Sequence, residues 1–93
     1  MKFSWSKKKA NSNLQKHGVS FEEAKSVFLD DLALLLDDPD HSADEERFIL
    51  LGYSSQARII IVCHCYRNNE EEMRLISARK ATKLESNSYR KRK

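Results

Sequence analysis

The hydrophobic and polar positions between residues 47 and 80 alternate as they do along strands that bury only one side. The alternation predicts three consecutive strands over 47–53, 58–66 and 73–80, separated by a turn at 54–56 and a polar loop at 67–72. An apolar-alternating start at 2–5 and an apolar run at 32–36 predict two further strands. The second half of the chain is therefore expected to form a β-meander.

Start and stop signals predict two helices between the first two strands. Ser6 can cap a helix over 7–16, and Gly18 can end it, because glycine adopts the left-handed conformation easily. Ser20 and Glu23 have the spacing of a capping box, which predicts a second helix over 21–28. The apolar stripe of that helix is expected to face the core: Phe21, Ala24, Val27 and Phe28.

Thr82 and Glu85 repeat the capping-box spacing and predict a C-terminal helix that runs through about residue 89. The predicted order is then β-α-α-β-β-β-β-α. Helices grouped outside a mainly antiparallel sheet define an α+β fold, with two N-terminal helices and a C-terminal helix packed on the sheet. We expect one domain over 1–89, followed by a basic tail over 90–93.

The faces of the central hairpin follow if Ser55 and Gln56 form a two-residue turn. Residues i and i+2 of a strand share a face, so the register decides which side chains lie together. In this register the mixed, open side holds Arg47, Tyr53, Arg58, His64 and Tyr66. The other side is uniformly apolar and is expected to meet the helices: Phe48, Leu50, Ile59, Ile61, Cys63 and Cys65.

The last hairpin offers two registers. Pairing Tyr66 with Met73 adds Arg79 to the open side and buries Ile76 and Ala78. A shift by one residue brings Arg74 and Lys80 to the open side instead. We prefer the first register, because it places more apolar side chains in the core.

Charge is unevenly distributed along the chain, although the net charge is only +3. Residues 22–46 hold ten acidic groups and one basic group, whereas residues 74–93 hold eight basic groups and one acidic group. A basic surface attracts phosphate backbones, so the second half is the candidate nucleic-acid-binding part. No signal-peptide pattern and no apolar stretch of about 20 residues is present, so we expect a cytoplasmic protein without membrane contact.

Two groups of metal-ligand residue types are present. Cys63 and Cys65 flank His64, but zinc sites usually add a second ligand pair, so we expect reduced thiols in the core. The polar loop over 37–46 holds several acids and His41, which can bind a divalent cation but usually form a solvated loop. We therefore expect neither a metal nor another cofactor.

A rigid sheet face with two or three arginines suits the cleavage of RNA. A base takes the ribose 2′-OH proton, the oxygen attacks the adjacent phosphorus, and an acid protonates the leaving 5′ oxygen. Arginines neutralise the charge that develops on the phosphorane. His64 or Glu46 is a candidate base, and Tyr53 or Tyr66 can stack on a nucleobase. The same residues also fit a non-catalytic nucleic-acid-binding or protein-binding module, or a merely solvated face.

Several blocks of this sequence resemble the BrnT family of toxins. They are Phe-Ser-Trp at 3–5, Lys-His-Gly-Val-Ser-Phe-Glu-Glu-Ala at 16–24, Asp-Pro-Asp-His at 38–41, Glu-Arg-Phe-Ile-Leu-Leu-Gly at 46–52, and Arg-Leu-Ile-Ser-Ala-Arg-Lys-Ala-Thr at 74–82. Glu85 and Tyr89 match the last helix of that family. Ser6, the hairpin tip at 68–72 and Arg90 depart from the family pattern.

The resemblance implies a type II toxin with a RelE-like fold, which cleaves RNA and thereby blocks translation. It also implies a ribbon-helix-helix antitoxin of the BrnA type that masks the toxin, with DNA bound only through the antitoxin complex. Arg47, Arg58 and Arg79 lie on the matching strands and are the implied functional arginines, with His64 and Glu46 as acid/base candidates. Tyr53, Tyr66 and Lys80 are candidates for RNA binding, and a homodimer is a further expectation.

Overall fold

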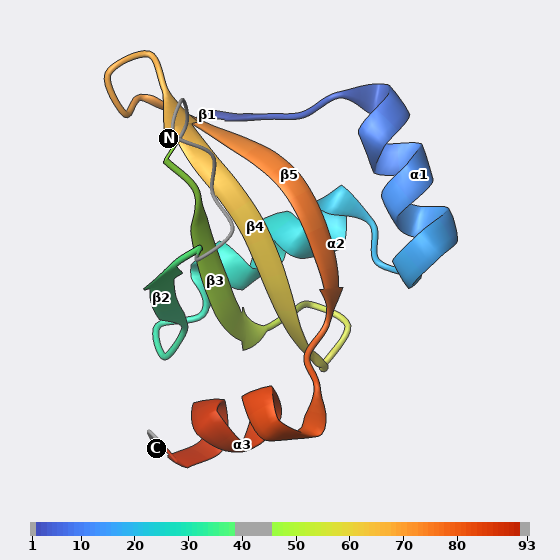
Figure 1. Ribbon diagram of the computed structural model, residues 1–93, viewed down its shortest axis with the longest axis vertical. Coiled ribbons are helices and arrows are strands. Elements are labelled where there is room, and N and C mark those ends of the chain that lie inside the picture. Colours follow the sequence, from blue (N-terminus) through green and yellow to red (C-terminus); the bar gives the residue numbers. More distant parts are fainter. Residues whose placement is uncertain (1, 39–45, 92–93) are drawn as a thin grey trace.

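The computed structural model describes residues 2–38 and 46–91, which form one mixed sheet with helices on both sides (Figure 1). The strand order is β1-β5-β4-β3-β2. β1 (Lys2–Ser4) runs parallel to β5 (Glu72–Lys80), and the remaining neighbours are antiparallel: β2 (Leu34–Asp37), β3 (Phe48–Tyr53) and β4 (Ile59–Arg67). The element order along the chain is the one expected from the sequence.

The helices begin where the capping signals predicted. α1 (Lys7–His17) is capped by the Ser6 hydroxyl, which accepts from Lys9 N–H, and ends at Gly18 with φ +67°. In α2 (Phe21–Ser26) the Ser20 hydroxyl accepts from Glu23 N–H. α2 continues as a short 3₁₀ turn, η1 (Val27–Leu29), instead of remaining α-helical to residue 28.

α3 (Lys83–Lys91) opens with a complete capping box, because Thr82 and Glu85 each accept a backbone N–H from the other. The helix extends two residues beyond the predicted end and so takes in Arg90 and Lys91. No helix in the described part of the chain has the length and apolar character needed to cross a bilayer.

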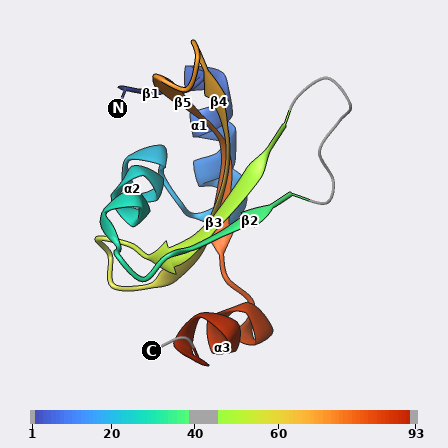
Figure 2. The same cartoon turned by 90° about the vertical axis from the view of Figure 1, so that its left-hand side faces the viewer.

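The main core lies between the sheet and the first two helices (Figure 2). Phe21, Ala24 and Val27 from α2 and η1 pack against Leu50, Ile60, Val62, Leu75 and Ala78 of the sheet. The buried Asn13 side chain fixes α1 to β5, because it donates to the Ala78 carbonyl (2.8 Å) and accepts from the Ala78 N–H (3.0 Å). A smaller apolar cluster on the opposite face joins Tyr89 of α3 to Leu51, Ile59 and Ile61.

The predicted register of the β3–β4 hairpin is wrong by one residue. Tyr53 pairs with Ile59, and His64 pairs with Phe48. The turn is a three-residue loop: Ala57 N–H donates to the Ser54 carbonyl, Ser54 N–H donates to the Arg58 carbonyl, and Ala57 has φ +59°. One extra loop residue moves every β4 side chain to the other face. Ile60, Val62 and His64 therefore face α2, and Ile59, Ile61, Cys63 and Cys65 do not.

The β4–β5 hairpin starts in the predicted register and then shifts. Tyr66 pairs with Met73 as expected, but a bulge between Cys63 and His64 moves Ser77 opposite Cys63 and Arg79 opposite Ile61. A bulge puts an additional residue in one strand, here Ile76, so the parity of β5 changes along its length. Arg74 and Arg79 consequently share one face, which an unbroken strand does not allow.

Candidate functional site

We call the sheet surface opposite α1 and α2 the open face. α3 lies across its lower end (Figures 1 and 2), where Tyr89 packs against Leu51, Ile59 and Ile61 of the sheet. Pairing and strand parity assign to it Arg47, Ile49, Cys63, Cys65, Arg67, Arg74, Ser77 and Arg79. This surface is the candidate functional site.

Three arginines come to the open face, two from β5 and one from the entrance to β3. Arg74 lies opposite Cys65, and Arg79 lies opposite Ile61. Arg47 precedes β3 and shares the parity of Ile49, so it approaches Cys65 from the other side. The Cα atoms of Arg47 and Arg74 are thus about two strand spacings, roughly 10 Å, apart, a separation that two arginine side chains can bridge. Arg74 was only the less-favoured alternative in the sequence, because no residue type signals the bulge.

Arg79 is held in a defined orientation. Its guanidinium donates twice to the Glu85 carboxylate, at 2.9 and 3.0 Å, and so ties β5 to α3. The Arg79 side chain remains 42% exposed. The arginine lowers the pKa of Glu85 to about 2, and the carboxylate raises the pKa of Arg79. Both groups are therefore ionised at neutral pH, and Glu85 is too weak a base for proton abstraction.

The two cysteines are free and buried, as predicted, but they lie in the floor of the open face and not against the helices. The Cys63 thiol contacts a carboxylate oxygen of Asp38 at 3.4 Å. Burial and that carboxylate raise the pKa of Cys63 to about 11, although Arg47 acts in the opposite direction. A thiol that stays protonated at neutral pH is a poor nucleophile and a poor metal ligand.

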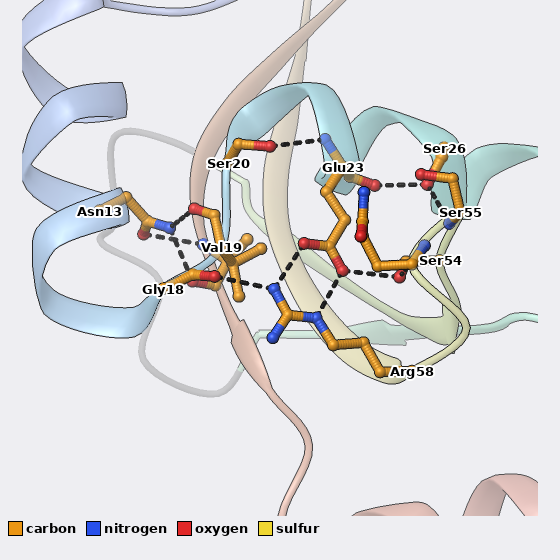
Figure 3. Close-up of polar contacts among 11 residues, drawn as sticks. Asn13, Gly18, Val19, Ser20, Glu23, Ser26, Ser54, Ser55 and Arg58 are labelled. Carbon is orange, nitrogen blue, oxygen red and sulfur yellow. Dashed lines mark hydrogen bonds and ion pairs between the residues drawn. The ribbon is translucent and has the colours of Figure 1, made fainter.

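Arg58 does not lie on the open face, which corrects the sequence-based placement. Its guanidinium donates to both carboxylate oxygens of Glu23, at 2.7 and 2.6 Å, and to the Gly18 carbonyl at 2.7 Å (Figure 3). Glu23 also accepts from the Ser54 hydroxyl at 2.6 Å. Burial would raise the pKa of Glu23, but the hydrogen bond and charge of Arg58 lower it. This network joins the β3–β4 loop to α2.

The two-residue turn expected from the sequence also puts His64 on the wrong face of the sheet. The side chain is fully buried on the helix side and packs against the rings of Phe28, Phe48 and Tyr66. Nδ1 lies 3.4 Å from the Val62 carbonyl, and Nε2 has no hydrogen-bond partner in the described structure. Burial lowers the pKa of His64, so the ring is neutral and cannot reach an RNA strand in this conformation.

The other predicted residues are divided between the two sides. Tyr53 lies on the open-face side but packs against Tyr89 at the end that α3 covers. Tyr66 packs into the main core and Lys80 pairs with Ile60, so both belong to the helix side. Glu46 is exposed beside Arg47 at the entrance to β3.

Metal binding finds no support in the described residues, among which no group of three or more histidine, cysteine or acidic side chains is placed to hold an ion. Most of the acidic loop considered above, residues 39–45 with Pro39 and His41, lies outside the described residues.

The structure is a small α+β domain with three arginines on one face of its mixed sheet. The model of the family described as "Ribonuclease toxin, BrnT, of type II toxin-antitoxin system" matches residues 5–85. The crystal structure of the Brucella abortus ribonuclease toxin BrnT superposes with a TM-score of 0.68 and 26% sequence identity, and the match covers 89% of this chain and 99% of that one. Among curated proteins none matches the chain.

The class is therefore a ribonuclease toxin of a type II toxin–antitoxin system. The chain belongs to the BrnT family.

Proposed function

We propose that this protein is a metal-independent endoribonuclease that inhibits translation when its antitoxin is absent. The family supplies the class of activity. The observation that most supports this particular site is the shared face of Arg47, Arg74 and Arg79, because three cations on rigid strands can hold one phosphodiester.

In the proposed mechanism the arginines bind the scissile phosphate and stabilise the phosphorane. Arg79 is preoriented by Glu85, and Arg47 and Arg74 approach from the other end of the face. Glu46 is the candidate base for the ribose 2′-OH, since it is exposed next to Arg47. The 2′ oxygen attacks the phosphorus and the bond from phosphorus to the 5′ oxygen breaks. The leaving oxygen takes a proton from the now protonated Glu46 or from water, which leaves a 2′,3′-cyclic phosphate and a 5′-hydroxyl.

The remaining sequence-based candidates receive other roles in this proposal. Arg58 supports the loop at residues 54–58 through Glu23, and His64 fills the core. Tyr53, on the open-face side, is the candidate for stacking on a nucleobase, and the basic residues of α3 extend the attraction for phosphate. A toxin of this kind would act in the cytoplasm, neutralised by a ribbon-helix-helix antitoxin.

Cleavage of a defined RNA by the purified toxin tests the proposal. Wild-type protein is expected to cut in the presence of EDTA and to leave cyclic phosphate ends. Arg79→Ala is expected to reduce the cleavage rate about hundredfold while the fold is kept. RNA that is bound but left intact by the wild type would favour the non-catalytic binding module instead.

Induction of the chain in cells without its antitoxin gives an independent readout. The wild type should arrest growth and fragment cellular RNA, and Arg79→Ala should relieve both effects. Normal growth and intact RNA under strong expression of the wild type would contradict the toxin proposal.

A further inference from the structure

The edge strand β2 exposes apolar side chains on both of its faces. Leu35 pairs with Leu50 on the helix side and is 54% exposed, and Leu36 pairs with Ile49 on the open-face side and is 48% exposed. Leu32, in the turn before the strand, is 44% exposed. Three large apolar side chains at a sheet edge are unusual, since edge strands commonly carry lysine, proline or a bulge that discourages pairing.

The backbone of β2 is also available along that edge. The Asp38 N–H donates to the Arg47 carbonyl at 3.1 Å, and in an antiparallel pair the bonds to one neighbour recur at every second residue. Leu36 and Leu34 therefore bond to β3, whereas Leu35 and Asp37 direct their N–H and C=O groups outward. β2 is terminal in the sheet, and no strand of the described residues pairs with its outer side (Figure 1).

We propose that β2 is the docking edge for the antitoxin, which adds a short strand to the sheet. This inference rests on the proposed function in so far as that function supplies the antitoxin. Main-chain bonds to Leu35 and Asp37 would fix the register, and apolar side chains on alternate faces would cover Leu35 and Leu36. The docking surface lies at the far edge of the sheet from β1 and next to the strand that follows Arg47.

Charge identifies the chemistry of the added strand. Asp31 and Asp37 are exposed and lie at the two ends of the segment, and the sequence contains no lysine or arginine between Lys25 and Arg47. The neighbouring Asp30 and Asp38 already contact Tyr53, Tyr89 and Cys63 inside the fold. A second copy of this chain would bring two sets of aspartates together across the new pair, which is unfavourable. An extended segment that alternates apolar residues with lysine or arginine complements both the leucines and the acids.

A proline substitution can test the outward backbone groups of β2 without removing the hydrogen bonds between β2 and β3. Leu35→Pro removes an outward-pointing N–H and should leave the β2–β3 bonds in place, because proline is tolerated on the free side of edge strands. Leu35→Lys is the second variant, and it opposes a basic partner by charge. Leu84→Gln, which removes an exposed leucine on α3, is the matched control for lost apolar surface.

The experiment combines backbone hydrogen exchange with titration of the antitoxin encoded beside the toxin. We expect amide protection at 34–37 on binding, an affinity at least about tenfold lower for both Leu35 variants, and no change for Leu84→Gln. If charge contributes to docking, the wild type should bind the antitoxin more tightly than Asp37→Asn does. This difference in affinity should be larger at low salt, where charges are screened less. Unchanged exchange at 34–37 with a tight complex, or protection of β2 by the toxin alone as its concentration rises, would overturn the inference.

Failure here is distinguishable from failure of the ribonuclease proposal. RNA cleavage by the free toxin is measured in parallel, and Leu35→Pro should cut RNA at the wild-type rate. A wild type that binds the antitoxin through β2 but leaves RNA intact supports the docking edge and contradicts only the enzyme.

Discussion

Two arginine–glutamate pairs join this sheet to its helices, and they differ in what they leave accessible. Arg58 binds Glu23 of α2, a carboxylate whose side chain is only 4% exposed and which also accepts from Ser54. Arg79 binds Glu85 of α3, and these side chains are 42% and 29% exposed. The same chemistry therefore stabilises the fold on the helix side and, on the open face, orients a cation that a phosphate can still approach.

The largest effect is expected when the buried pair is broken. Arg58→Ala leaves the ionised Glu23 carboxylate buried with only Ser54 as a side-chain donor, which should lower the free energy of unfolding by about 3 kcal/mol. For a domain of this size the melting temperature falls by roughly 15 °C. Thermal and urea denaturation measure both quantities.

A double variant serves as the control for that prediction. Glu23→Met combined with Arg58→Met removes both charges and should recover much of the lost stability, because no buried charge is left unpaired. A single variant as stable as the wild type would show that the pair is not structural.

The exposed pair should behave in the opposite way. Arg79→Ala should reduce RNA cleavage about hundredfold, equivalent to about 2.7 kcal/mol of transition-state stabilisation, but should lower the free energy of unfolding by about 1 kcal/mol or less. Arg79→Lys keeps the charge and loses the bidentate geometry, so we expect intermediate activity. Single-turnover cleavage and denaturation of the same preparations measure activity and stability separately. If Arg79→Ala lost stability as strongly as activity, the exposed pair would be structural like the buried one, and the contrast between the two pairs would be refuted.

His64 should make the helix side sensitive to acid. Its pKa is lowered in the folded state, so below about pH 6.5 the unfolded chain takes up a proton that the folded chain does not. Stability is then lost as pH falls, by at most about 1.4 kcal/mol for each pH unit, until the pH reaches the lowered pKa of the folded state. His64→Leu should remove this slope from the pH dependence of unfolding between pH 7 and pH 5; a slope identical in the variant would assign it to other groups.

Glu85 is expected to give the smallest effect on stability. Folding lowers the pKa of Glu85 from 4.5 to about 2. Its contribution to stability is therefore complete above pH 4.5 and disappears as the pH drops toward 2. Because the pair is partly exposed and screened by solvent, Glu85→Gln should lower the free energy of unfolding at neutral pH by about 1 kcal/mol or less. The variant should slow RNA cleavage less than Arg79→Ala does, because the arginine remains but is no longer held in place. Equal losses in the two variants would show that Glu85 itself takes part in the reaction.

The elements of this fold could be predicted because their signals are local. Ser6, Ser20 and Thr82 cap helices by contacts within a few residues, and Gly18 ends α1 in the left-handed conformation. The assignment of faces failed because it depends on Ala57 and on the bulge near His64. Alanine rarely adopts positive φ, so no residue type at 54–58 signals a three-residue loop.

The candidate site shows the same limit. Arg47 and Arg79 were assigned to the open face from the sequence, and the structure agrees on their side of the sheet. Arg58 and His64 were assigned to it only through the two-residue turn, and one additional loop residue moved both to the helix side. The bulge that aligns Arg74 with Arg79 follows from the packing of the whole sheet, which no local pattern encodes.

The most direct test compares the RNA cleavage rate of Arg74→Ala with that of Arg58→Ala, each expressed per folded molecule at a temperature where both variants are folded. If the open face holds the phosphate, Arg74→Ala should lose at least about tenfold in rate, and Arg58→Ala should cut at nearly the wild-type rate. Full activity of Arg74→Ala together with an inactive but folded Arg58→Ala would locate the reaction on the helix side and contradict the site described above.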